Sequence, residues 1–105
     1  MKFVFLPEAL LEFEEAAAYI GRDSAQNARL LIERVEEAIA YILKHPDENL
    51  RGRYGTLRRK IRRQSHWLVY RRLPNEPETI EIIALAHEKR GETYWQKRFS
   101  SLHQP

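Results

Sequence analysis

Residues 51–72 read RGRYGTLRRKIRRQSHWLVYRR and contain nine basic side chains and no acidic one. Apolar residues recur among these cations in a pattern typical of β-strands, and we predict strands at 56–63 and 67–73. Side chains of a strand point alternately to its two faces. We therefore expect an array of positive charge on an open face of a sheet, formed first by Arg58, Lys60 and Arg62.

The segments on either side of this stretch complete a small α+β pattern. Residues 79–86 read as a further strand that is apolar on both faces, and residues 2–6 read as a short first strand ended by Pro7. Two amphipathic helices lie between the first strand and the basic stretch, and residues 92–99 are expected to form a terminal helix. The core-facing positions of the two long helices are expected to be Leu10, Phe13, Ala17 and Ile20 in the first, and Ala28, Leu31, Ile32, Val35, Ala38, Ile39 and Ile42 in the second.

The ends of the two helices also carry recognisable signals. Gly21 is a plausible stop for the first helix, Asp23 is expected to cap the second, and Pro46 is expected to end it. Residues 47–55 read as a polar loop. The prediction is one domain, residues 1–105, with order βααβββ and a terminal helix, in which a helical hairpin packs on a mostly antiparallel four-stranded sheet.

The charge of the chain is divided between its two halves. Residues 1–50 contain ten acidic and five basic side chains, whereas residues 51–105 contain thirteen basic and five acidic ones. A cationic surface of this kind favours a polyanionic or acidic partner. The alternative is that the arginines pair internally with acidic residues of the second helix, namely Glu33, Glu36 and Glu37.

Several classes of protein are disfavoured by composition. The chain has no cysteine, so a disulfide framework and a thiolate nucleophile are excluded. The four histidines lack metal-ligand spacing, and no phosphate-binding glycine loop is present, so we expect neither a metal nor a cofactor. No apolar run approaches the length of a membrane span, and a cytoplasmic location without membrane association is expected.

A few residues of the second half could carry chemistry. His87 ends the last predicted strand, where it could act as a general acid or base or be a buried histidine with a structural role. His66 is open to the same two interpretations. Tyr94 and Trp95 stand next to Lys97 and Arg98; such aromatics stack on bases or pack into cores.

The order of these parts resembles the RelE/ParE superfamily of bacterial type II toxins. The resemblance covers nearly the whole chain. It is carried by Pro7 after the first strand, by the helix ending in Leu43-Lys44-His45-Pro46, and by three later segments: Leu57-Arg58-Arg59, Trp67-Leu68-Val69-Tyr70-Arg71, and Ala86-His87-Glu88-Lys89-Arg90 followed by Tyr94-Trp95-Gln96-Lys97-Arg98.

The resemblance implies a growth-blocking toxin of the kind found in plasmid-stabilising modules, neutralised by a cognate antitoxin. ParE-like members inhibit DNA gyrase, and the His-x-x-Arg and Tyr-Trp-x-x-Arg ending favours that group. RelE-like members cut mRNA on the ribosome, and in that case the catalytic candidates are His87, Arg62 and Tyr94. A third possibility is a nucleic-acid-binding domain without toxicity. The candidates for binding the target are Arg58, Lys60, Arg62, Arg71, Arg90 and Arg98.

Overall fold

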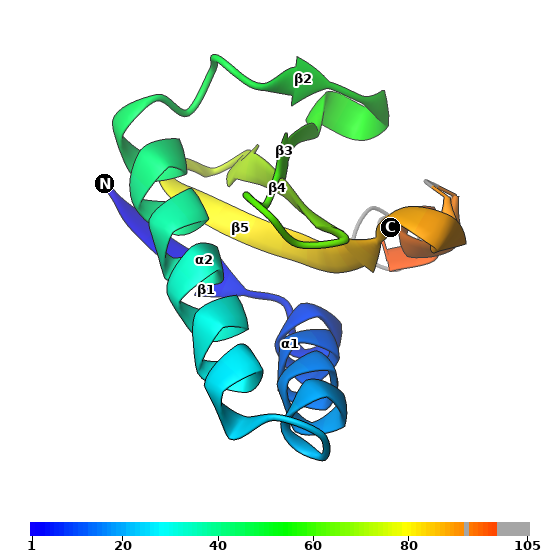
Figure 1. Ribbon diagram of the computed structural model, residues 1–105. Coiled ribbons are helices and arrows are strands. Elements are labelled where there is room, and N and C mark those ends of the chain that lie inside the picture. Colours follow the sequence, from blue (N-terminus) through cyan, green and yellow to red (C-terminus); the bar gives the residue numbers. More distant parts are fainter. Residues whose placement is uncertain (92, 99–105) are drawn as a thin grey trace.

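The structure is a computed structural model that describes residues 1–91 and 93–98. Its elements follow the order strand, two helices, four strands, as Figure 1 shows. Their bounds are β1 Lys2–Phe5, α1 Pro7–Gly21, α2 Ala25–Lys44, β2 Leu50–Arg51, β3 Leu57–Lys60, β4 His66–Leu73 and β5 Glu76–His87, with short 3-10 helices at Arg53–Gly55, Glu88–Arg90 and Tyr94–Gln96.

The strands form one mixed sheet in the order β1-β5-β4-β3-β2. β1 runs parallel to β5, and the other neighbours are antiparallel. The predicted α+β fold is confirmed. The sheet gains a fifth strand, because Leu50 and Arg51 pair with β3 inside the segment expected to be a polar loop.

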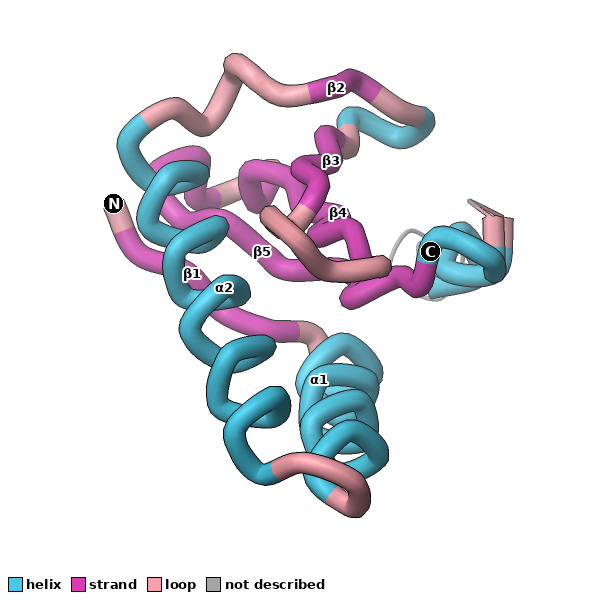
Figure 2. Tube along the Cα trace, in the orientation of Figure 1, coloured by secondary structure: helices cyan, strands magenta, loops and turns pink. Residues whose placement is uncertain are grey.

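The two helices form a hairpin that covers one face of the sheet (Figure 2). The apolar stripe of α2 supplies five buried residues to the core: Leu31, Val35, Ala38, Ile39 and Ile42. The N-terminus of α2 is capped by Ser24, whose Oγ accepts a hydrogen bond of 3.0 Å from the N–H of Asn27. The prediction of Asp23 as the cap is wrong, because the helix begins at Ala25.

The buried face of α1 differs in part from the predicted one. Ala9 is fully buried, whereas Leu10 is 44% exposed. The prediction that Leu10 faces the core is therefore wrong. Phe13, Ala17 and Ile20 pack on the core as predicted, and Ala9 and Ala16 pack there as well. Small residues at three of these positions allow α1 to lie close to the sheet.

A β-bulge changes which residues of β5 share a face. Val69 pairs with Ala84 and Tyr70 pairs with Ile82, so Ile83 is the extra residue. Ile80, Ile82 and Leu85 consequently pack on the helix side, although simple alternation placed Leu85 opposite the other two. On the second face a smaller cluster forms from Val69, Ile83, Ala84, Ala86 and Trp95.

The predicted terminal helix lies partly outside the described residues, which exclude 92 and 99. The described part contains the 3-10 helix Tyr94–Gln96, and its Trp95 is buried against the second face of the sheet. That face is therefore partly covered. Among the described residues, no helix combines the length and the apolar character needed to cross a membrane.

Candidate functional site

The first basic strand divides its cations between the two faces of the sheet. Arg59 lies on the helix side, where its guanidinium stacks 3.6 Å from the ring centroid of Tyr41. Arg58 lies on the other side, over the ring of Trp67. Lys60 donates a hydrogen bond to the carbonyl oxygen of Gln64. The strand keeps Arg58 and Lys60 on one face, as predicted.

Arg62 leaves this array. Because β3 ends at Lys60, the side chain of Arg62 follows a turn and not the alternation of a strand. Its Nε and Nη2 donate to the carboxylate of Glu37 on α2, at 2.8 Å and 3.1 Å. The hydrogen bond from Arg62 holds the pKa of Glu37 down to about 2. The prediction that Arg62 shares the face of Arg58 is wrong, and internal pairing with Glu37, the stated alternative, is observed.

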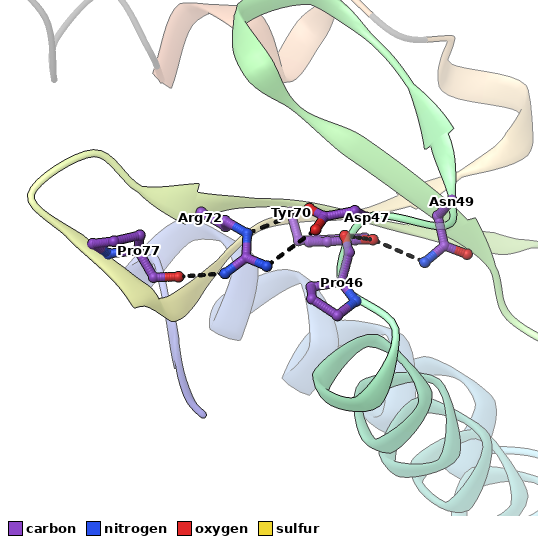
Figure 3. Close-up of polar contacts among 6 residues, drawn as sticks. All are labelled: Pro46, Asp47, Asn49, Tyr70, Arg72 and Pro77. Atoms are coloured by element: carbon purple, nitrogen blue, oxygen red, sulfur yellow. Dashed lines mark hydrogen bonds and ion pairs between the residues drawn. The ribbon is translucent and has the colours of Figure 1, made fainter.

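The two arginines of β4 are also bound internally. Arg71 Nε lies 3.0 Å from Glu81 Oε1 on β5, and both side chains are at least nine-tenths buried. Arg72 binds Asp47 through two nitrogens and donates to the carbonyl oxygen of Pro77 at 2.6 Å (Figure 3). The hydrogen bond from Arg72 lowers the pKa of Asp47. The structure therefore does not contain an entirely open positive face.

Tyr70 fastens the segment that follows α2 to the sheet. Its hydroxyl donates to the carbonyl oxygen of Pro46 and accepts from the amide of Asn49, both at 2.8 Å (Figure 3). Arg59 in turn donates to Asn49 Oδ1 at 3.1 Å. Burial raises the pKa of Tyr70, so its hydroxyl keeps its proton.

The C-terminal candidates meet at a glutamate of α1. Glu12 accepts hydrogen bonds from the hydroxyl of Tyr94 at 2.8 Å, from Arg98 at 2.9 Å and from the backbone N–H of Leu85 at 3.2 Å. The guanidinium of Arg90 lies 3.7 Å from the same carboxylate and the same distance from the ring centroid of Tyr94. Burial and the hydrogen bond to Glu12 strongly raise the pKa of Tyr94.

The sequence analysis gives no role to Glu12, which is not among the core-facing positions predicted for the first helix. The available signal is its spacing. Glu12 follows the buried Ala9 by three residues and precedes the half-buried Ala16 by four, so it lies on the sheet-facing side of α1.

The two central histidines form a pair at the end of the sheet. His66 and His87 are cross-strand partners, and their ring centroids are 5.1 Å apart. His87 Nδ1 accepts from the N–H of Lys89 at 3.1 Å. Burial, followed by the nearby His87 and Lys60, lowers the pKa of His66. Two imidazoles in contact suit proton transfer as well as packing.

This pair lines a groove of about 580 Å³ between α1 and the ends of β4 and β5. Its walls include Glu12, Tyr19, Arg22, His66, His87 and Arg90. His87 also borders a smaller cavity of about 220 Å³ on the second face, walled by Trp67 and Trp95 with Arg58. Within the described chain, no three histidine, aspartate or glutamate residues are grouped so that they could hold a metal ion.

The structure thus gathers His87, Arg90, Tyr94 and Arg98 around Glu12 and the groove. It places Arg62 at α2, Arg71 beside Glu81, and Arg58 and Lys60 on the second face. Arg62 does not line the groove that contains His87.

Comparison with solved structures agrees with this fold. The isolated E. coli RelE toxin matches with a TM-score of 0.57 and 20% identity over 95% of this chain and 96% of that chain. A mutant E. coli RelE toxin in complex with a peptide of its antitoxin RelB matches with a TM-score of 0.56 and 19% identity over 97% and 93% of the two chains. At this level of identity the likeness shows the fold. No curated protein matches the chain.

A family model gives a more specific assignment. The model described as "ParE toxin of type II toxin-antitoxin system, parDE" matches residues 3–91, which include both helices and all of the sheet except Lys2. The resemblance to the RelE/ParE superfamily is confirmed, and the chain belongs to the ParE toxin family of type II toxin–antitoxin systems.

Proposed function

We propose that this toxin blocks growth by binding and inhibiting DNA gyrase, with no bond-breaking chemistry of its own. One observation carries the proposal: the residues that a nuclease would use are engaged by different internal partners. Arg62 is bound to Glu37, and the hydroxyl of Tyr94 is bound to Glu12. His87 lines a groove that Arg62 does not reach.

The ionisation of these groups also favours binding over catalysis. Cleavage of RNA requires a group that takes the proton of a ribose 2′-hydroxyl and a group that protonates the leaving oxygen. Tyr94 cannot serve as a base at neutral pH, because its strongly raised pKa keeps the hydroxyl protonated. Arginine keeps its proton at neutral pH, and the charge of Arg62 is already balanced by Glu37.

The test is a supercoiling assay with purified chain, relaxed plasmid and DNA gyrase. We expect supercoiling to stop as the ratio of toxin to gyrase rises, and to resume when the antitoxin is added. RNA incubated with the same preparation and with ribosomes should remain intact. Full supercoiling at a many-fold excess of folded toxin would show that the proposal is wrong.

A ribosome-dependent endoribonuclease is the second candidate function. The histidine pair beside Arg90 favours it, because His66 and His87 could share the proton transfers while the arginine balances the charge on phosphate. In this case His87→Ala abolishes mapped mRNA cuts and Arg90→Ala reduces them. If both variants remain fully toxic and no cuts appear, the nuclease is excluded.

We also propose a cognate antitoxin as the partner of this chain. The RelE mutant above is bound to a peptide of its antitoxin, and the present chain offers cations for an acidic segment. Arg51, Arg53 and Arg63 are exposed and form no ion pair with another described residue. An antitoxin segment that brings carboxylates to these three positions would complete their pairing. Co-expression with the product of the neighbouring reading frame should restore growth.

A further inference from the structure

Within the part of the chain that the structure describes, the N-terminal strand forms an open edge of the sheet. β1 is the outermost strand next to β5. The N–H of Leu6 donates to the carbonyl oxygen of Ile82 on β5 at 2.9 Å. The N–H and C=O of one strand residue point to the same side, and the side alternates along the strand. Val4 therefore directs its backbone groups toward β5, and Phe3 and Phe5 direct theirs outward.

The side chains of β1 do nothing to block an approaching strand. Phe3 is 41% exposed and Val4 45% exposed, and they point to opposite faces of the sheet. Lys2 is the only charged residue of the strand, which contains no proline. Edge strands of monomeric proteins usually carry charges, prolines or bulges that prevent pairing.

The opposite edge strand, β2, has features that usually prevent pairing with another strand. β2 is two residues long and includes Arg51, and it is followed directly by Gly52 and Arg53. The two edges therefore differ, and β1 is the edge that is better suited to bind another strand.

We propose that β1 pairs in antiparallel fashion with β1 of a second copy of this chain, which joins the two sheets edge to edge. The strand is complementary to itself about Val4. With Val4 opposite Val4 of the second copy, Phe3 lies opposite Phe5 of that copy. Both of these residues direct their backbone groups outward, so each such pair exchanges both of its backbone hydrogen bonds.

The same register suits the side chains. Phe3 and Phe5 already lie on one face and contact each other in a T-shaped arrangement, at 6.0 Å between centroids. Pairing extends this contact into an aromatic row across the two copies. In this register Lys2 comes opposite Leu6 of the second copy, so no two like charges lie directly opposite each other across the two-fold axis.

Cysteine cross-linking tests this register directly, because the chain has no cysteine of its own. In a pair without backbone hydrogen bonds, opposed Cα atoms are about 4.5 Å apart. That separation falls within the disulfide range of about 4.4–6.8 Å. Val4→Cys should therefore give a covalent dimer under mild oxidation. Phe3→Cys is the matched control, since its residue is similarly exposed but lies diagonal to its own copy, and it should remain largely monomeric.

Analytical ultracentrifugation of the full chain provides the second measurement. We expect a concentration-dependent dimer for the natural chain and a monomer for Val4→Lys, which places two like charges opposite each other. Circular dichroism of each variant checks that the fold is kept. A monomer at every concentration, or equal cross-linking of Phe3→Cys and Val4→Cys, overturns the proposal. Protection of Val4→Cys by the antitoxin alone, with no dimer of the free chain, assigns the edge to the antitoxin and also overturns it.

Discussion

Among single residues, Glu12 connects segments that are distant in the sequence. Its carboxylate binds Leu85 on β5 and two side chains of the C-terminal segment, Tyr94 and Arg98. A largely buried carboxylate is costly to desolvate unless hydrogen bonds compensate it, and here donors from two elements do so. Glu12 is therefore a structural residue that fixes the position of Tyr94.

Replacing the carboxylate of Glu12 should weaken its contacts with Leu85, Tyr94 and Arg98. We expect Glu12→Gln to lower the free energy of unfolding by roughly 1–3 kcal/mol, because Arg98 loses its carboxylate while remaining mostly buried. Urea denaturation measures the change. Glu14→Gln is the control at an exposed position of the same helix, and it should change stability by less than about 0.5 kcal/mol. Equal effects of the two substitutions would contradict the assigned role.

His66 should make stability depend on pH. In the folded chain burial lowers the pKa of His66 below 6.5, so the unfolded chain takes up this proton first as the pH falls. The free energy of unfolding is expected to fall as the pH drops below about 6.5. Urea denaturation between about pH 7.5 and pH 5 should show this slope in the natural chain and a flatter one in His66→Gln.

The pH range over which His66 changes the free energy of unfolding is separate from the range over which Glu37 does so. The lowered pKa of Glu37, about 2 against an ordinary 4.5, makes its stabilising contribution disappear only as the pH falls below about 4.5. Parallel slopes for the natural chain and His66→Gln above that pH would exclude the histidine as the cause.

Among the elements, the segment between α2 and β2 is attached to the sheet largely through the hydroxyl of Tyr70. Tyr70 on β4 binds the backbone of Pro46 and the side chain of Asn49, and Arg72 adds the bond to Asp47. These contacts hold the end of α2 over the sheet. They also position the short β2 strand at the far edge.

Tyr70→Phe should loosen this attachment without changing the core. The substitution keeps the ring and leaves two buried polar partners unsatisfied, and we expect a loss of about 0.5–1.5 kcal/mol in the free energy of unfolding. Tyr19→Phe removes a hydroxyl from an exposed ring and serves as the matched control. Chemical denaturation of the two variants measures the difference, and a similar loss in both would argue against the attachment.

The elements differ in how far the sequence alone could predict them. The stripe of α2 predicts its buried face, because five apolar residues recur with helical spacing. The faces of β5 could not be predicted, since the bulge at Ile83 depends on pairing with β4. β2 was missed because two residues carry no periodic signal.

For the whole molecule, the distribution of charge determines which cations are available to a partner. Arg62, Arg71 and Arg72 lie in the basic stretch but are bound to acidic residues far away in the sequence. The sequence predicts the residue types of the candidate site, whereas their pairing depends on contacts made only in the folded chain. In the basic stretch, Arg51, Arg53 and Arg63 are exposed arginines that form no ion pair with another described residue.

The division between paired and exposed arginines leads to a binding prediction. An Arg51→Ala, Arg53→Ala double variant should bind the antitoxin several-fold more weakly and with a smaller dependence on salt, because exposed charges mainly govern the rate of association. Arg62→Ala removes a charge that is already balanced, so its effect should be smaller. Surface plasmon resonance at two salt concentrations measures both variants, and equal losses would show that pairing does not determine the binding surface.

The pairing of β1 with β5 has a consequence for synthesis of the toxin. Lys2 lies beside Thr79 in the finished sheet, so a nascent chain cannot complete this pairing until β5 has left the ribosome. The helical hairpin, built from local contacts, is free to form first. The sheet is therefore completed after the hairpin, which leaves an interval in which an antitoxin already present could bind the partly folded product.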